Sequence, residues 1–306
     1  MCEARELIDP WSVISFGEAP PPRQTVLMSR RFAQVDVFSA DPIGGNPVAV
    51  VVDAEGVTDE QMAAFARWTN LSETTFLLPP THDGADYRLR IFTPGGELPF
   101  AGHPTLGSAH AWLEAGNTAK GEHMVQECGI GLVTVRDDGH TLAFAAPPLS
   151  RSGPVDEDTL GHVRAGLRVE PAEVLGAHWV VNGPNWMVLE LPSPERVLDL
   201  EPDMAALGGQ EVGVLARYDG GKPGEPDVAY EVRAFVPGLG VPEDPVTGSL
   251  NAGIAVWLRD AGRTESYVAA QGTALGRTGR VHVTYTDTDI WVGGAATTVV
   301  AGTVSL

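Results

Sequence analysis

The chain has 306 residues, of which 43% are hydrophobic and 20% are charged, and its formal net charge is −20. These values are typical of a globular protein of about two domains, and they exclude intrinsic disorder and fibrous repeats. A nucleic-acid partner is disfavoured, because it would require a basic face and the chain has only two lysines, Lys120 and Lys222.

The N-terminal residues and the number of cysteines indicate the cellular compartment of the protein. Residues 1–27 have neither the basic start nor the apolar centre of a secretory signal, so we interpret them as a loose N-terminal extension, and Met28 is an alternative start. Cys2 and Cys128 are too few for a disulfide framework, and no apolar run is long enough to cross a membrane. We therefore expect a cytoplasmic protein with no membrane partner.

The first elements alternate strands with a helix. Residues 32–38 and the segment ending at Val52 have strand patterns and flank a turn-rich stretch, which predicts a hairpin. Thr58 and Gln61 have the spacing of a capping box, so a helix should follow Thr58 and stop at Asn70. Residues 74–78 and 87–92 again have strand composition.

Two later segments predict helices of a different kind. Residues 104–113 and 250–258 are small or apolar on nearly every side and end near Gly116 and Gly262. A helix without a wide polar face is usually enclosed by other structure, here by a curved sheet. The sequence therefore predicts an α+β fold with one central helix in each of two domains.

Both helices belong to an internal duplication. Its first copy reads Arg90-x-Phe92-x-Pro94, then Glu97-x-Pro99-x-x-Gly102-x-x-x-x-Gly107-x-Ala109. Its second copy reads Arg233-x-Phe235-x-Pro237, then Glu243-x-Pro245-x-x-Gly248-x-x-x-x-Gly253-x-Ala255. We interpret the repeat as two pseudo-symmetric domains that face one cleft, although a duplicated folding unit without function has the same pattern.

Each copy brings a helix N-terminus to this cleft. Unpaired backbone N–H groups at a helix N-terminus attract a carboxylate, and glycine allows a ligand to approach them closely. Gly102 and His103 would supply such amides in the first copy, with Pro104 at the first helical position. Gly248 and Ser249 would supply them in the second copy, with Thr247 or Ser249 as the helix cap.

Glu73 is the strongest acid–base candidate, with His103 and Asp244 beside it. It lies between a helix end and an apolar strand, where burial would disfavour its charged form and let it hold a proton near neutral pH. A solvated loop glutamate is the alternative. Glu97 and Glu243 are expected to orient the duplicated loops by pairing with the matched Arg90 and Arg233.

Other chemistries lack the motifs that they require. The eight histidines show no H-x-x-x-H or H-E-x-x-H spacing, and the sequence contains no G-x-S-x-G elbow and no phosphate-binding G-x-x-x-x-G-K-[ST] loop. Gly238-Leu239-Gly240 lacks the third glycine of a dinucleotide fingerprint. The sequence predicts neither a metal nor a cofactor.

Five segments together resemble the phenazine-biosynthesis PhzF-type isomerases, a branch of the diaminopimelate epimerase-like fold. The resemblance covers about residue 30 to Leu306 and rests on 45–47 (Gly-Asn-Pro), 70–74 (Asn-Leu-Ser-Glu-Thr), 90–94 (Arg-Ile-Phe-Thr-Pro), 97–104 (Glu-Leu-Pro-Phe-Ala-Gly-His-Pro) and 243–249 (Glu-Asp-Pro-Val-Thr-Gly-Ser).

The resemblance implies two domains, each a curved, mostly antiparallel sheet wrapped around a central helix, with the active site between them. We expect residues 28–142 plus about 290–306 to form the first domain and 143–289 the second. A homodimer without a cofactor is implied as well. Glu73 would be the general acid/base, and the substrate would contact His103, Asp244, Ser249, Gly102, Gly248 and Asn46.

The resemblance also guides the choice of reaction. Racemising relatives use two cysteines, but the corresponding positions hold Ala101 and Thr247. The sequence therefore favours an allylic double-bond shift in a small cyclic carboxylic acid, with trans-2,3-dihydro-3-hydroxyanthranilate as the most concrete substrate. Leu250-Asn251 departs from the common family pattern, which affects the expected substrate shape. A non-catalytic small-molecule binder and a racemase with a non-cysteine base pair remain as alternatives.

Overall fold

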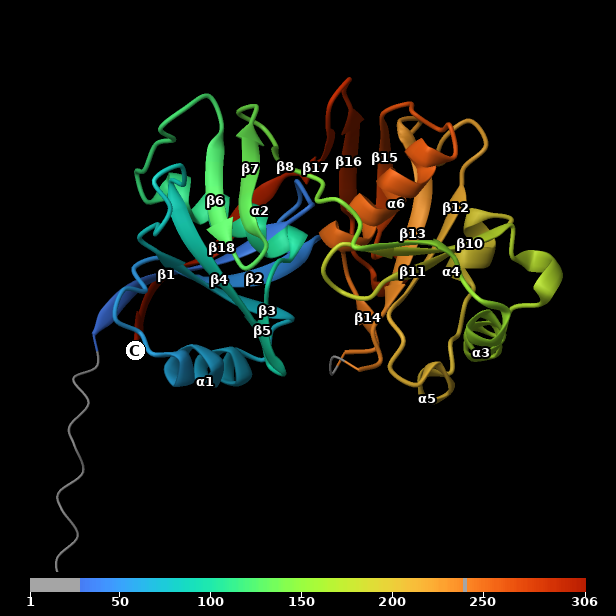
Figure 1. The fold of residues 1–306 in the computed structure, drawn as a ribbon, viewed down its shortest axis with the longest axis horizontal. Helices are drawn as coiled ribbons and strands as arrows, with labels where there is room; N and C mark the ends of the chain where they lie inside the picture. Colours follow the sequence, from blue (N-terminus) through green and yellow to red (C-terminus); the bar gives the residue numbers. More distant parts are fainter. Residues whose placement is uncertain (1–27, 239–240) are drawn as a thin grey trace, which may run out of the picture.

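The structure, a computed structural model, describes residues 28–238 and 241–306, so the predicted N-terminal extension lies outside the described residues. Two lobes lie side by side, and in each of them strands surround one central helix (Figure 1). The fold is α+β, as the sequence predicts, with few helices and one large curved sheet.

The N-terminal lobe surrounds helix α2 (Gly102–Glu114), and helix α1 (Asp59–Thr69) lies outside its sheet (Figure 1). Its strands are β1 (Ser29–Val37), β2 (Asn46–Val51), β3 (Glu73–Leu78), β4 (Tyr87–Thr93), β5 (Gly96–Leu98), β6 (Met124–Cys128), β7 (Gly131–Asp137), β8 (Leu142–Ala145) and β18 (Ala296–Ser305). The predicted hairpin is confirmed, because β1 pairs with β2 in antiparallel register.

The C-terminal lobe surrounds helix α6 (Gly248–Asp260), and shorter helical segments lie toward its outer side (Figure 1). Its strands are β9 (Arg151–Pro154), β10 (Gly176–Val181), β11 (Met187–Glu190), β12 (Val212–Arg217), β13 (Val228–Phe235), β14 (Glu243–Asp244), β15 (Tyr267–Gln271), β16 (Gly279–Tyr285) and β17 (Ile290–Gly294). Its other helical segments are α3 (Glu157–Leu167), η1 (Pro171–Glu173), α4 (Pro194–Leu198), α5 (Met204–Leu207) and η2 (Thr273–Leu275).

Helix α1 shows the predicted capping box. The Thr58 side chain accepts the Gln61 backbone N–H, and the Gln61 side chain accepts the Thr58 backbone N–H. Asn70 ends the helix in the left-handed region at φ 53°, a conformation that asparagine tolerates better than most residues. This tight end lets the chain enter β3 within three residues, which fixes the position of Glu73.

The two central helices are buried on nearly all sides, as their composition predicts. They lie against the strands at small residues: a Cβ atom on Gly107 would approach Val48 Cγ1 to 2.3 Å, and one on Gly253 would approach the Val180 carbonyl oxygen to 2.6 Å. Both helices begin earlier than the sequence predicts, so Pro104 is the third helical residue rather than the first.

The sheet is continuous across the two lobes. Strand β17 pairs with β16 of the C-terminal lobe and with β8 of the N-terminal lobe, after which β18 returns to pair with β1. Within the described residues, all 18 strands therefore belong to one sheet. The exact domain boundaries stay a prediction.

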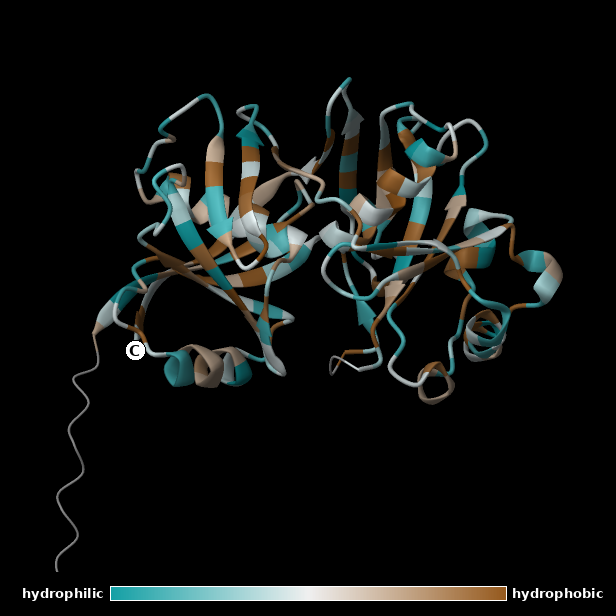
Figure 2. Ribbon diagram, in the orientation of Figure 1, coloured by the Kyte–Doolittle hydropathy of each residue, from teal (hydrophilic) through white to brown (hydrophobic). Residues whose placement is uncertain are grey.

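Side-chain hydropathy follows this architecture. Hydrophobic and hydrophilic residues alternate along many strands of both lobes (Figure 2). One large hydrophobic cluster includes residues of both lobes, among them Leu106 of α2 and Leu250 of α6. Among the described helices, none is both long and apolar enough to span a membrane.

Candidate active site

A cavity of about 110 Å³ lies where the N-termini of α2 and α6 meet, and residues of both lobes line it. The N-terminal lobe contributes Glu73 of β3 and residues 98–103, and the C-terminal lobe contributes Asp244 and residues 247–249. The volume is somewhat below that of an engineered apolar cavity of about 150 Å³ that binds benzene, so a single ring with small substituents is the appropriate ligand size. The sequence-predicted cleft is thus a small site between the two lobes.

The two helix N-termini approach each other closely in this cavity. Ala101 and Thr247 precede the helices, and neither side chain caps its helix. The predicted cap by Thr247 or Ser249 is wrong, because the Thr247 hydroxyl donates to Asp244 Oδ2 at 2.6 Å instead. The first N–H groups of both helices therefore remain available for an anion at the cavity wall.

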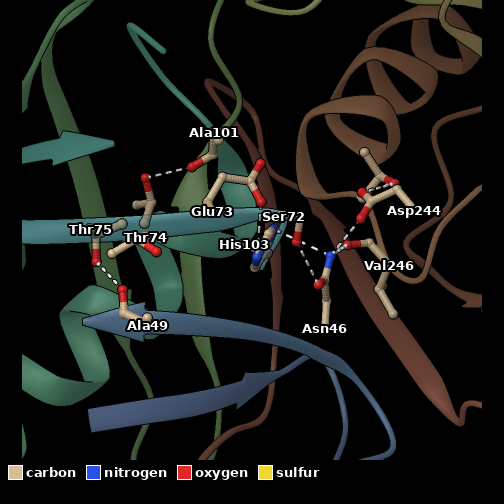
Figure 3. Close-up of polar contacts among 12 residues, drawn as sticks. Asn46, Ala49, Ser72, Glu73, Thr74, Thr75, Ala101, His103, Asp244 and Val246 are labelled. Carbon is tan, nitrogen blue, oxygen red and sulfur yellow. Dashed lines mark hydrogen bonds and ion pairs between the residues drawn. The ribbon is translucent and has the colours of Figure 1, made fainter. Parts of the chain in front are cut away.

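Glu73 and His103 lie side by side at the cavity. Glu73 Oε2 lies 3.5 Å from His103 Nε2, and the two side chains are only 14% and 3% exposed. Within residues 28–238 and 241–306, neither atom has a hydrogen-bond partner. Figure 3 shows the Glu73 carboxyl group beside the His103 ring. Two unpartnered polar atoms at a ligand-sized cavity are unusual in a folded protein and indicate a functional site.

Burial sets the protonation of this pair. Desolvation and the nearby negative charge of Asp244 raise the pKa of Glu73 to about 8, although a hydrogen bond from Ser72 opposes this. Desolvation lowers the pKa of His103 to about 3, against a hydrogen bond to the Pro47 backbone. At neutral pH, Glu73 therefore carries a proton and His103 is neutral, so the imidazole can accept from the carboxyl group.

Asp244 is held as the second carboxyl group of the site. Burial raises its pKa to about 6, while hydrogen bonds from Thr247 and Asn46 lower it. Asn46 Nδ2 donates to Asp244 Oδ1 at 2.8 Å and to the Val246 carbonyl oxygen at 2.9 Å (Figure 3). Asn46 is fully buried, is not among the described residues that line the cavity and positions Asp244, so its direct contact with a substrate stays a prediction.

The predicted pairing of the duplicated arginines is confirmed. Arg90 donates to both Glu97 carboxylate oxygens, at 2.7 and 2.6 Å, and Arg233 donates to both oxygens of Glu243, at 3.0 and 2.8 Å. The second pair is buried, and Arg233 also donates to the backbone carbonyl of Leu200. These pairs hold β5 and β14 against β4 and β13, next to the two helix N-termini.

The cavity wall contains further polar residues that were not predicted from the sequence, among them Trp186 and Glu211. Trp186 Nε1 donates to Ser249 Oγ at 3.1 Å, so it orients a hydroxyl that was predicted to bind substrate. Trp186 ends a loop rich in Gly, Pro and Asn between two apolar strands, and this composition could have identified the loop as a candidate part of the site. Glu211 follows Gly208, Gly209 and Gln210 and belongs to no motif.

Three features outside this cavity are relevant to ligand or metal binding. Cys128 is a free thiol away from this cavity. In the part of the chain that the structure describes, no three His, Cys, Asp or Glu residues are grouped to hold a metal ion. A larger hollow of about 360 Å³ is lined by Arg217, Arg263 and Tyr267, but Arg263 there is already paired with Glu190.

Comparison with known proteins agrees with this geometry. Residues 35–302 match the family model of phenazine biosynthesis-like proteins. Antisense-enhancing sequence 1 of Schizosaccharomyces pombe is 37% identical, with 89% of this chain and 97% of that protein covered. A trans-2,3-dihydro-3-hydroxyanthranilate isomerase of Pseudomonas aeruginosa is 34% identical, with 82% of this chain and 89% of that enzyme covered.

A solved structure supports the same assignment. The crystal structure of an Enterococcus faecalis phenazine biosynthesis protein of the PhzF family superposes with a TM-score of 0.72 at 26% identity, covering 91% of this chain and all of that one. The family match spans both lobes and both helix N-termini of the cavity. This chain therefore belongs to the phenazine biosynthesis-like, or PhzF, protein family, which includes isomerases.

Proposed function

We propose that this protein is a cofactor-independent isomerase that shifts a proton and a double bond in a small cyclic carboxylic acid. The observation that carries the proposal is the Glu73–His103 pair, in which two unpartnered atoms lie 3.5 Å apart at a cavity of ring size. A trans-2,3-dihydro-3-hydroxyanthranilate isomerase among the relatives makes that compound the first substrate to test.

The substrate carboxylate would bind at the two helix N-termini. The amides of Gly102, His103, Gly248 and Ser249 lie there, and the partial positive charge of each helix end favours an anion. Asp244, fixed by Asn46 and Thr247, would accept a hydrogen bond from a ring substituent. These contacts would hold one allylic carbon near Glu73.

Glu73 would then act first as an acid. Its proton passes to one ring carbon while the double bond shifts, which leaves Glu73 as a carboxylate. The carboxylate next removes a proton from the other end of the allylic system, so the carboxyl group is restored and no net proton is gained or lost. Neutral His103 would orient the carboxyl proton between turnovers, since its Nε2 has no other partner in the part of the chain that the structure describes.

Proton NMR in D2O tests this proposal directly. In D2O the resting Glu73 carboxyl exchanges its proton for a deuteron, so each turnover should place a deuteron on a ring carbon as the double bond migrates. Glu73→Gln should bind the ligand but turn over about 10²- to 10⁴-fold more slowly, the usual contribution of a positioned acid–base group. Full activity of the Glu73→Gln variant would refute the mechanism.

Two controls separate the alternatives. Glu60→Gln changes an exposed carboxylate on helix α1, away from the cavity wall, and should leave turnover within a few-fold of wild type. A wild-type protein that binds the ligand without any deuterium incorporation would be a binding protein instead. Deuterium incorporation with loss of optical rotation and no double-bond migration would identify a racemase.

A further inference from the structure

The carboxyl group of Glu211 belongs to the wall of the active-site cavity, although neither the proposed mechanism nor the sequence motifs use it. Glu211 directly precedes β12. Its backbone carbonyl accepts the Met187 N–H at 3.1 Å, and one carboxyl oxygen accepts the Asn185 N–H. These bonds fix Glu211 to the loop before β11, so the side chain is held in place without a ligand.

Among the described residues, Glu211 has no cation partner, unlike several other glutamates of the C-terminal lobe. Glu243 is paired with Arg233, Glu190 with Arg263 and Glu225 with Arg280. Among the described residues, the Asn185 N–H is the only hydrogen-bond donor to the Glu211 carboxyl group.

Burial raises the pKa of Glu211, while the Asn185 bond lowers it. The other carboxyl oxygen has no donor among the described residues and is not buried, so a ligand that fills the cavity can desolvate it and must then supply a donor.

The charges around the cavity determine which ligands the Glu211 carboxylate would favour. No lysine or arginine is among the described residues of the cavity wall, and His103 is neutral at physiological pH. Among the described residues of the cavity wall, the two helix N-termini therefore supply the positive potential, whereas Glu211 and Asp244 are acceptors. A ligand with a carboxylate alone would satisfy the helix ends and leave Glu211 desolvated without a partner.

We propose that Glu211 is a specificity-determining residue that accepts a hydrogen bond from a protonated amino group of the substrate. The inference rests on the proposed function for the location of the substrate, but it concerns ligand choice rather than the proton transfer. The enzyme would thus select zwitterionic cyclic amino acids over carboxylic acids with a hydroxyl group at the same carbon. This preference would arise mainly because the Glu211 carboxylate has no hydrogen-bond donor opposite it when a hydroxy acid is bound.

Two ligands that differ in one group test the proposal. Trans-2,3-dihydro-3-hydroxyanthranilate carries an amino group where trans-2,3-dihydro-2,3-dihydroxybenzoate carries a hydroxyl group. Their dissociation constants are measured by calorimetry in the Glu73→Gln background, in which turnover is suppressed. We expect the amino ligand to bind about 10- to 100-fold more tightly, as expected for a charge-assisted hydrogen bond.

Adding Glu211→Gln to this background should remove most of that preference while the protein keeps its melting temperature, since the amide oxygen can still accept from the Asn185 N–H. Asn185→Ala is the matched control: it changes an exposed side chain on the same loop, keeps the backbone donor and should keep the preference.

An unchanged preference in Glu211→Gln, equal binding of the two ligands, or binding of neither would overturn the proposal. Loss of deuterium incorporation by wild-type protein, with the preference intact, would instead refute only the isomerase mechanism.

Discussion

Gly102 and Gly248 lie so close together that neither position has room for a side chain. A Cβ atom on Gly248 would lie 2.9 Å from Gly102 Cα and 3.0 Å from the His103 backbone nitrogen. A Cβ atom on Gly102 would lie 2.9 Å from Gly248 Cα. The duplicated glycines are therefore the point where the two helix N-termini touch, and this contact sets the spacing of the amides at the cavity.

Gly248→Ala should consequently damage both stability and activity. The atoms in the way are backbone atoms, so the helix ends must separate, and overpacking of this kind costs about 1–3 kcal/mol. We expect a lower denaturation midpoint in urea and a larger loss in kcat/KM than in kcat.

Gly161→Ala is the control for that substitution. It lies on helix α3, where a new Cβ atom would meet only Arg164 Nη2 at 3.9 Å. Gly161→Ala should be neutral or stabilising by up to about 1 kcal/mol, because alanine favours a helix over glycine. Equal damage from both substitutions would show that the glycine contact has no special role.

The pH dependence of kcat/KM should be bell-shaped. The mechanism requires protonated Glu73, whose pKa is raised to about 8, and ionised Asp244, whose pKa is raised to about 6. Activity should therefore rise with pH through about 6 and fall again through about 8, as kcat/KM measured across pH 4.5 to 9.5 will test.

Asp244→Asn distinguishes the two limbs of this profile. The substitution removes the group that must ionise, so the acidic limb should disappear while the maximum activity falls. It also removes a negative charge that raises the pKa of Glu73, so the alkaline limb should move to lower pH. An alkaline limb that stays in place would contradict the assignment of that limb to Glu73.

Glu73→Gln should stabilise the folded protein at alkaline pH. Burial raises the pKa of Glu73 from 4.5 to about 8, so between these values the unfolded chain releases a proton that the folded protein retains. The free energy of unfolding therefore falls as pH rises from about 4.5 to 8, and glutamine avoids this loss. The gain in melting temperature should be larger at pH 8 than at pH 5.

Glu127→Gln is a control that should change the stability at alkaline pH in the opposite direction. Desolvation alone would raise the pKa of Glu127, but hydrogen bonds from Thr81 and His82 outweigh it and lower the pKa. That carboxylate contributes stability above its unfolded pKa, so its replacement should lower the melting temperature at pH 8. A gain of similar size from both substitutions would argue against a specific effect of Glu73.

The two duplicated ion pairs should differ in their contribution to stability. The Arg233 and Glu243 side chains are 7% and 6% exposed, whereas Arg90 and Glu97 are 20% and 42% exposed. Arg233→Met leaves a buried carboxylate and should cost about 3–5 kcal/mol, while Arg90→Met should cost about 1 kcal/mol or less. Urea denaturation of both variants checks this order, and an equal loss would refute it.

Much of the fold could be predicted from the sequence, because the patterns that indicate it are local or occur twice. The capping box of Thr58 and Gln61 needs only a three-residue spacing, and the enclosed character of α2 follows from its composition. The duplication predicted two similar lobes and both arginine–glutamate pairs, since each pair lies within one copy of the repeat. Local hydrogen bonds and side-chain periodicity suffice for such features.

Only the tertiary structure could decide which residues meet in the cavity. Asn46 and Asp244 are 198 positions apart, yet one hydrogen bond joins them and makes Asn46 a support for Asp244 rather than part of the cavity wall. Glu211 reaches the cavity through a loop with no recognisable motif. Asp244, whose negative charge adds to burial in raising the pKa of Glu73, likewise comes close to Glu73 only in the folded protein. The sequence determined the elements and their duplication, whereas desolvation and long-range contacts arise only when the two lobes pack together.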